Sequence, residues 1–112
     1  MTTLMPKDDN EQAIPALRLR PGGAHQITVT ASSRTNTTPF AETTRVIGVY
    51  ATGPVFIRTG AAGVSAAASD HFFPGGVYYD ISLGDRRHGT RHSHLAAVRA
   101  DHDCTLYISE KE

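Results

Sequence analysis

Short runs of apolar, β-branched and aromatic residues, separated by turn residues, dominate the chain from about residue 43 onward. The clearest runs are residues 43–51, 54–59, 77–83, 94–99 and 104–109, and Gly, Pro or an Asp-rich turn divides most of them. Runs of this length and spacing are typical of β-sandwiches and barrels. We therefore predict an all-β fold, a β-sandwich of jelly-roll type with about seven or eight short antiparallel strands.

Two further strands are predicted nearer the N-terminus. Residues 16–20 form the first candidate, which the Pro21 turn ends, and residues 25–31 form the second because apolar and polar residues alternate along them. The inward positions of all predicted strands give an expected core of Ile27, Val29, Val46, Val49, Val55, Ile57, Val77, Ile81, Leu95, Val98, Leu106 and Ile108.

The turn residues also predict how the strands connect. Residues 45–51 are apolar on both faces, which indicates a central strand. The tight connection at residues 52–54 predicts a hairpin with residues 55–58, and a final hairpin is expected from residues 95–99 and 104–109. The small residues 60–69 read as a loop followed by a thin strand at residues 64–67.

The length of the chain sets the number of domains. A chain of 112 residues is enough for a single modest core. We assign residues 1–13, which are polar and acidic, to an N-terminal arm that is flexible or becomes ordered on meeting a partner. Residues 14–112 form the β-sandwich domain. The first residues lack an apolar stretch, so we expect no signal peptide.

Composition excludes several classes of function. The 11 Lys and Arg residues balance the 11 Asp and Glu residues, so we expect no electrostatic binding of nucleic acid. No stretch is long and apolar enough for a membrane span, and we expect no membrane insertion. The single cysteine, Cys104, excludes an intrachain disulfide and reads as a buried thiol on an apolar strand face.

A basic, His-rich segment at residues 85–94 is the main candidate for chemistry. Residues two apart in an extended segment share a face, so His92 and His94 could chelate one ion. The third ligand could be His88, Asp85, His102 or Asp103. This would suit a small cupin-like metal-dependent enzyme, which we keep as the alternative function. Three arginines in the same segment would repel a dication, and no carboxylate follows the His pair at the spacing that cupins use. We therefore expect no metal, no cofactor and no catalytic residue.

The same segment is a better candidate for a protein interface. Its charged side chains cannot lie in the core without partners and should gather at one end of the sandwich. Tyr78 and Tyr79 must point to opposite faces of their strand, so at least one lies outside the core. The interface candidates are Arg86, Arg87, His88, Arg91, His92, Tyr78 and Tyr79.

Three stretches between residues 43 and 110 carry a family resemblance. They are residues 50–60, residues 69–77 with their Ser-Asp-x-aromatic-x-Pro-x-Gly order, and residues 95–110, which end in Thr-Leu-Tyr-Ile-Ser-Glu. These stretches resemble the small head spike base proteins of phage-derived gene transfer agents and tailed phages.

The resemblance implies a virion structural protein without enzymatic activity. Such a base is made in the bacterial cytoplasm, sits on the head surface of a phage-like particle and contacts the major capsid protein, which is then the expected partner of the N-terminal arm. It forms a homo-oligomeric ring, a pentamer by this analogy, and carries a spike or fibre protein that meets the host surface.

Overall fold

The computed structural model of the chain describes residues 17–84 and 90–112, and in these residues it contains eight strands and no helix. The strands are β1 (Leu19–Val29), β2 (Arg34–Thr35), β3 (Val46–Ala51), β4 (Val55–Gly60), β5 (His71–Phe73), β6 (Tyr78–Ser82), β7 (His94–Arg99) and β8 (Cys104–Lys111). The all-β prediction is confirmed. The predicted arm, residues 1–13, lies outside the described residues.

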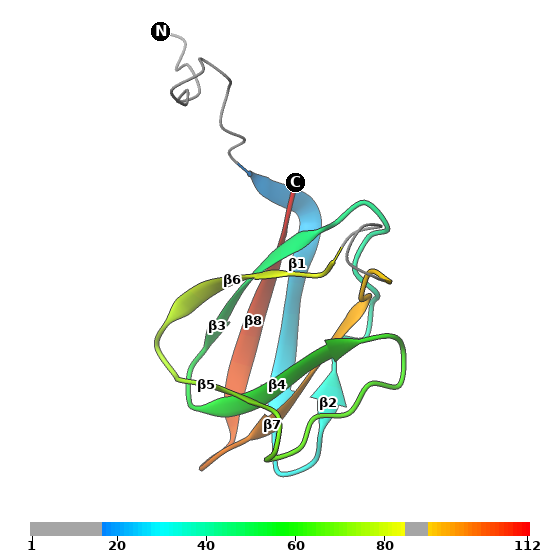
Figure 1. Ribbon diagram of the computed structural model, residues 1–112. Coiled ribbons are helices and arrows are strands. Elements are labelled where there is room, and N and C mark those ends of the chain that lie inside the picture. The colour runs from blue at the N-terminus through cyan, green and yellow to red at the C-terminus, as the bar shows by residue number, and fades with distance from the viewer. Residues whose placement is uncertain (1–16, 85–89) are drawn as a thin grey trace, which may run out of the picture.

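The strands form two four-stranded antiparallel sheets (Figure 1). The first sheet has the order β1-β8-β3-β6 and the second has the order β2-β7-β4-β5. Strand β3 lies between β8 and β6, which confirms that residues 45–51 form a central strand. The edges of the first sheet are β1 and β6, and those of the second are β2 and β5.

The core is built from the inward-facing residues of both sheets. In the first sheet Val49 is in register with Ile108, and both are almost completely buried. Val55 and Leu95 of the second sheet belong to the same apolar cluster. Burial of such side chains contributes roughly 1.5–3 kcal/mol each. The two sheets therefore hold one common core.

Both predicted hairpins are wrong. Strands β3 and β4 belong to different sheets, and so do β7 and β8, so each connection crosses the core from one sheet to the other. The two crossings are bonded to each other, because Thr52 donates its N–H to the Thr105 carbonyl and Ala100 donates to that of Pro54. β4 cannot pair with β3 because β6 and β8 already occupy both sides of β3.

The strands before β3 differ from those predicted. Residues 19–29 form one long strand, β1, whose pairing with β8 shifts between Leu19 and Ala24. Gly22 takes a left-handed backbone conformation there, with φ of 76°, so the predicted turn is a local irregularity within the strand. Residues 64–67 form no strand, and the short strands β2 and β5 were not predicted.

Most of the predicted core residues are buried, but Val77 is not. It is 45% exposed because it precedes the edge strand β6 and lies outside the space between the sheets. Val46, Ile81 and Val98 are only partly buried. The core also contains residues that the strand pattern did not select, namely Phe40, Ile47, Ala51, Ala66, Phe73, Leu83, Ala96 and Ala97.

No helix in residues 17–84 and 90–112 has the length and apolar character that crossing a membrane requires.

Candidate interaction surfaces

The outer face of the first sheet carries a row of three tyrosines. Strand pairing places Tyr50 next to Tyr78 on one side and Tyr107 on the other. Their exposed fractions are 52% for Tyr78, 39% for Tyr50 and 46% for Tyr107. Neighbouring strands lie about 4.8 Å apart, so the three side chains are adjacent on the surface. This row, the tyrosine row, is an exposed aromatic surface of the kind enriched at protein interfaces.

Tyr78 lies flat across the sheet instead of standing away from it. A side chain on Gly48 would collide with the Tyr78 phenol, so glycine is required for this close approach. The Lys111 ammonium lies 4.9 Å from the centre of the Tyr78 ring and 2.7 Å from Asp80 Oδ1. The hydrogen bond to Asp80, together with that to Tyr78, raises the pKa of Lys111. The positive charge of Lys111 and the negative charge of Asp80, both beside Tyr78, therefore neutralise each other.

Tyr79 points to the opposite face of β6, as the sequence predicted. It lines an apolar pocket of about 340 Å³ that lies between β6 and β5, at one edge of both sheets. Ile57, Phe73 and Ile81 form other walls of this pocket, and Phe72 is 59% exposed at its margin. The two sheets thus leave aromatic surface accessible at this edge.

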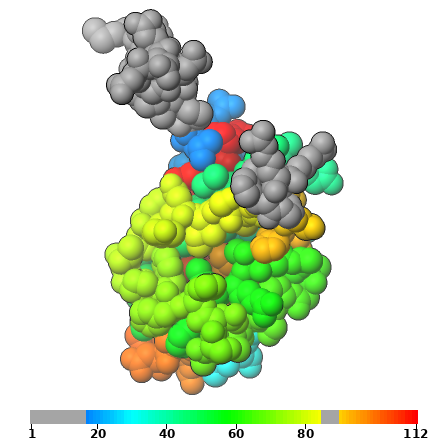
Figure 2. All heavy atoms as spheres, in the orientation of Figure 1, coloured from blue at the N-terminus to red at the C-terminus, as the bar shows by residue number. Residues whose placement is uncertain are grey.

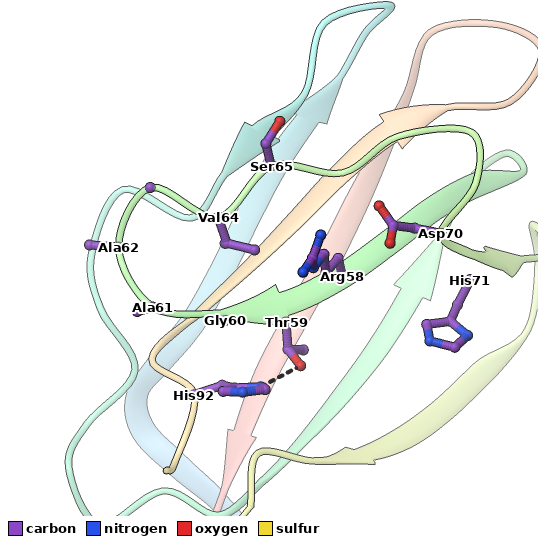
Figure 3. Close-up of a pocket in the computed structure, with 11 residues that line it drawn as sticks. Arg58, Thr59, Gly60, Ala61, Ala62, Val64, Ser65, Asp70, His71 and His92 are labelled. Atoms are coloured by element: carbon purple, nitrogen blue, oxygen red, sulfur yellow. Dashed lines mark hydrogen bonds between the residues drawn. The ribbon is translucent and has the colours of Figure 1, made fainter.

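A second, more polar groove adjoins this pocket (Figure 3). It has a volume of about 930 Å³ and is bounded by the end of β4 and the loop of small residues that follows it. Arg58, Asp70, His71 and His92 line it. The His92 imidazole Nδ1 lies 2.8 Å from the hydroxyl oxygen of Thr59, which orients the ring.

The apolar pocket and the polar groove are adjacent. Arg58, Thr59 and His71 line both of them, and we call the two together the edge trough. Strand β5 pairs with β4 only from Val55 to Ile57, which leaves the last part of β4 without a described strand neighbour on that side. In the space-filling view, the green β4 segment and the yellow-green segment around residues 70–80 lie next to each other on the visible face (Figure 2).

The predicted basic interface segment is only partly described. Arg86, Arg87 and His88 lie outside the described residues. Arg91 turns toward the protein, and its guanidinium donates hydrogen bonds of 3.3 Å to the backbone carbonyls of Thr44 and His92. Among the described residues of this segment, 90–94, His92 is the one that lines the edge trough.

The two histidines considered as a metal pair have different neighbours. His92 lies against Thr59, whereas the His94 Nδ1 lies 2.7 Å from the Ser93 hydroxyl, and His94 is buried. Among residues 17–84 and 90–112, no three His, Cys, Asp or Glu side chains are grouped as a metal site would require. Cys104 lies against the core and is partly buried, and this burial raises the pKa of its thiol.

A buried polar cluster is the feature that the sequence analysis missed. The Glu110 carboxylate lies 2.7 Å from His25 Nε2 and accepts hydrogen bonds from the Ala41 N–H and the Thr44 hydroxyl. Burial alone would raise the pKa of Glu110, but the bonds from Thr44, His25 and Ala41 outweigh it and lower that pKa. The sequence does indicate a buried Glu110, because this residue follows Leu106 and Ile108 on the inward face of β8.

The cluster is a structural feature of the fold. It joins β1, β8 and the loop before β3 across one end of the first sheet. Glu110 and Thr44 are almost completely buried, which leaves the carboxylate no room to meet a substrate. The accessible surfaces are therefore the tyrosine row and the edge trough.

Comparisons of this chain with protein-family models, with curated proteins and with solved structures give no match.

Proposed function

We propose that this chain is a non-enzymatic virion structural protein, the capsid-attached base of a head spike or fibre that contacts the host surface. The observation that carries the proposal is the strand order, β1-β8-β3-β6 in one sheet and β2-β7-β4-β5 in the other. This order supports a β-sandwich of jelly-roll type, in which each sheet takes alternate strands from both halves of the chain. Viral capsid domains use that architecture.

The described surface supports a role in assembly. Two separate faces carry exposed aromatic side chains, the tyrosine row on the outer face of the first sheet and the edge trough beside β6. A base protein needs several such faces, because it contacts its own copies, the major capsid protein and the spike or fibre protein. Exposed Tyr and Phe residues supply apolar contact area with little loss of side-chain entropy.

Self-association is the first property to test. On the analogy with head spike bases, the chain forms a pentameric ring on the head surface of a phage-like particle. Native mass spectrometry of the purified chain at micromolar concentration should find a closed oligomer, with five copies expected. A chain that remains monomeric over this concentration range would argue strongly against the proposal.

The rival function is a cupin-like metal enzyme that uses His88, His92 and His94. Cupins share the jelly-roll architecture, so fold alone does not separate the two functions. Elemental analysis of dialysed protein does separate them. We expect no retained zinc, iron or manganese, because His92 and His94 have separate hydrogen-bonding partners. A metal-to-chain ratio near one would favour the enzyme.

A further inference from the structure

The edge trough has two chemically different halves. Its apolar half is walled by Ile57, Phe73, Tyr79 and Ile81 at the open edge between the two sheets. Its polar half contains the exposed guanidinium of Arg58 and the carboxylate of Asp70, one oxygen of which accepts the Ala67 N–H at 2.8 Å. An extended peptide that fits the whole trough needs apolar side chains followed closely by charged ones.

The N-terminal segment of the chain has this composition. Leu4 and Met5 are followed, after one proline, by Lys7, Asp8 and Asp9. Leu4 and Met5 are apolar, like the apolar half of the trough. The two aspartates are opposite in charge to Arg58, and Lys7 is opposite in charge to Asp70.

The overall charges of the two parts are also complementary. Residues 1–16 contain one lysine and three acidic residues, a formal charge of −2. The remaining residues contain ten cationic and eight acidic residues, a formal charge of +2. Opposite charges on two surfaces speed and orient their association.

The position of the trough favours a contact between copies. The chain enters the first sheet at β1, whereas the trough lies beside β6, the opposite edge of the same sheet. Each copy therefore offers a donor segment at one edge and an acceptor site at the other. Repetition of such a head-to-tail contact gives a ring when the rotation between copies closes. Sixteen extended residues span roughly 50 Å, which is long enough to reach a neighbouring copy.

We propose that residues 1–16 of one copy bind in the edge trough of the next copy, with Leu4 and Met5 in the apolar half and Asp8 and Asp9 facing Arg58. The occupant is thus a second copy of this chain, and not the capsid protein that the family resemblance led us to expect as the partner of this arm. This inference rests on the proposed ring and specifies the contact that closes it.

Photocrosslinking on the full-length chain tests the location of the contact. The chain with p-benzoylphenylalanine in place of Met5 is mixed with an isotope-labelled copy, irradiated and digested. We expect crosslinks between labelled and unlabelled copies that map to β5 and β6, near Phe72 and Tyr79. Crosslinks only within one copy, or none in the trough, would overturn the inference.

A charge exchange tests the ionic half of the contact. Arg58→Glu should weaken ring association by about tenfold or more, and adding Asp8→Lys and Asp9→Lys to the same chain should restore much of it. Arg45→Glu is the matched control, because Arg45 is also exposed but lines neither half of the trough. If Arg58→Glu and Arg45→Glu have equal effects, or the exchange gives no recovery, the inference is wrong.

Failure of this inference can be told apart from failure of the proposed function. If wild-type chains form rings but the crosslinks avoid the trough, the ring stands and this contact is wrong. If wild-type chains form no oligomer, the proposed ring itself is wrong. Thermal unfolding of each variant shows whether a lost ring reflects a lost fold.

Discussion

His25 Nε2 and Glu110 Oε2 lie 2.7 Å apart at the inward side of the first sheet, and both side chains are largely buried. The two residues are 85 positions apart in sequence, yet they occupy paired strands, β1 and β8. Their contact, together with the bonds from Thr44 and Ala41, ties the loop before β3 to the sheet. The hydrogen bonds of this cluster therefore hold the two strands and the loop together beside an otherwise apolar core.

Removing the Glu110 carboxylate should lower the stability of the folded chain. Glu110→Ala leaves His25, the Thr44 hydroxyl and the Ala41 N–H buried without their acceptor, so we expect a loss of about 3 kcal/mol in the free energy of unfolding. Glu112→Ala is the control, because its ion pair with Arg18 is exposed and should matter by less than about 0.5 kcal/mol. Urea denaturation measures the free energy of unfolding of both variants. Equal losses of stability in the two would contradict the structural role of Glu110.

Stability should also depend on pH through Glu110. Its pKa in the folded chain lies below the ordinary value of 4.5, so the unfolded chain takes up a proton at higher pH than the folded chain does. The stabilisation is therefore complete above the ordinary value and is lost as the pH falls below it toward the folded-state pKa. Wild type should lose more stability than Glu110→Gln as the pH falls from about 5 to 3. Parallel pH profiles would show that Glu110 contributes nothing to this loss.

Tyr78 should stabilise the sheet as well as contribute to the exposed surface. Its ring covers Gly48 and lies beside the Lys111 ammonium, so Tyr78→Ala should lower the free energy of unfolding by about 1 kcal/mol. Tyr78→Phe keeps the ring and should behave almost as wild type. Chemical denaturation measures the free energy of unfolding of the two variants. Equal destabilisation of both would show that the hydroxyl of Tyr78, rather than its ring, stabilises the sheet.

Arg91 should act mainly on folding rather than on assembly. Arg91→Ala removes the donor to the Thr44 and His92 carbonyls and should cost about 1 kcal/mol of stability. Because both acceptors are neutral, the loss should change little with salt concentration. Arg45→Ala, a change at an exposed arginine, should be nearly neutral. A variant of Arg91 with wild-type stability and a salt-dependent assembly defect would instead assign this residue to an interface.

The sequence identified the strands better than it identified their partners. Alternation along residues 104–109 and 25–29 correctly placed Ile108, Leu106 and Ile27 in the core. Residues 52–54 look the same whether the chain turns back within a sheet or crosses to the other one, so the hairpin predictions failed. That choice depends on whether both sides of β3 are already occupied, which is a long-range property.

The candidate surfaces were predictable only in part. Neighbouring residues on a strand face opposite ways, so the separation of Tyr78 from Tyr79 followed from sequence alone. The edge trough did not, because it joins side chains of β4, β5 and β6 with His92, which follows β6 by ten residues. Glu110 was accessible to sequence reasoning, since a carboxylate on an apolar strand face signals a buried partner.

Electron cryomicroscopy of particles made with and without this chain can show whether the chain is the base of a head spike. Particles from cells that produce the chain should carry a ring of extra density on the head surface, with a spike or fibre attached. Particles from cells that lack its gene should keep intact heads but lose both the ring and the spike, and expression of the chain from a plasmid should restore them. Heads with the same surface density in both preparations would show that the chain is not a head spike base.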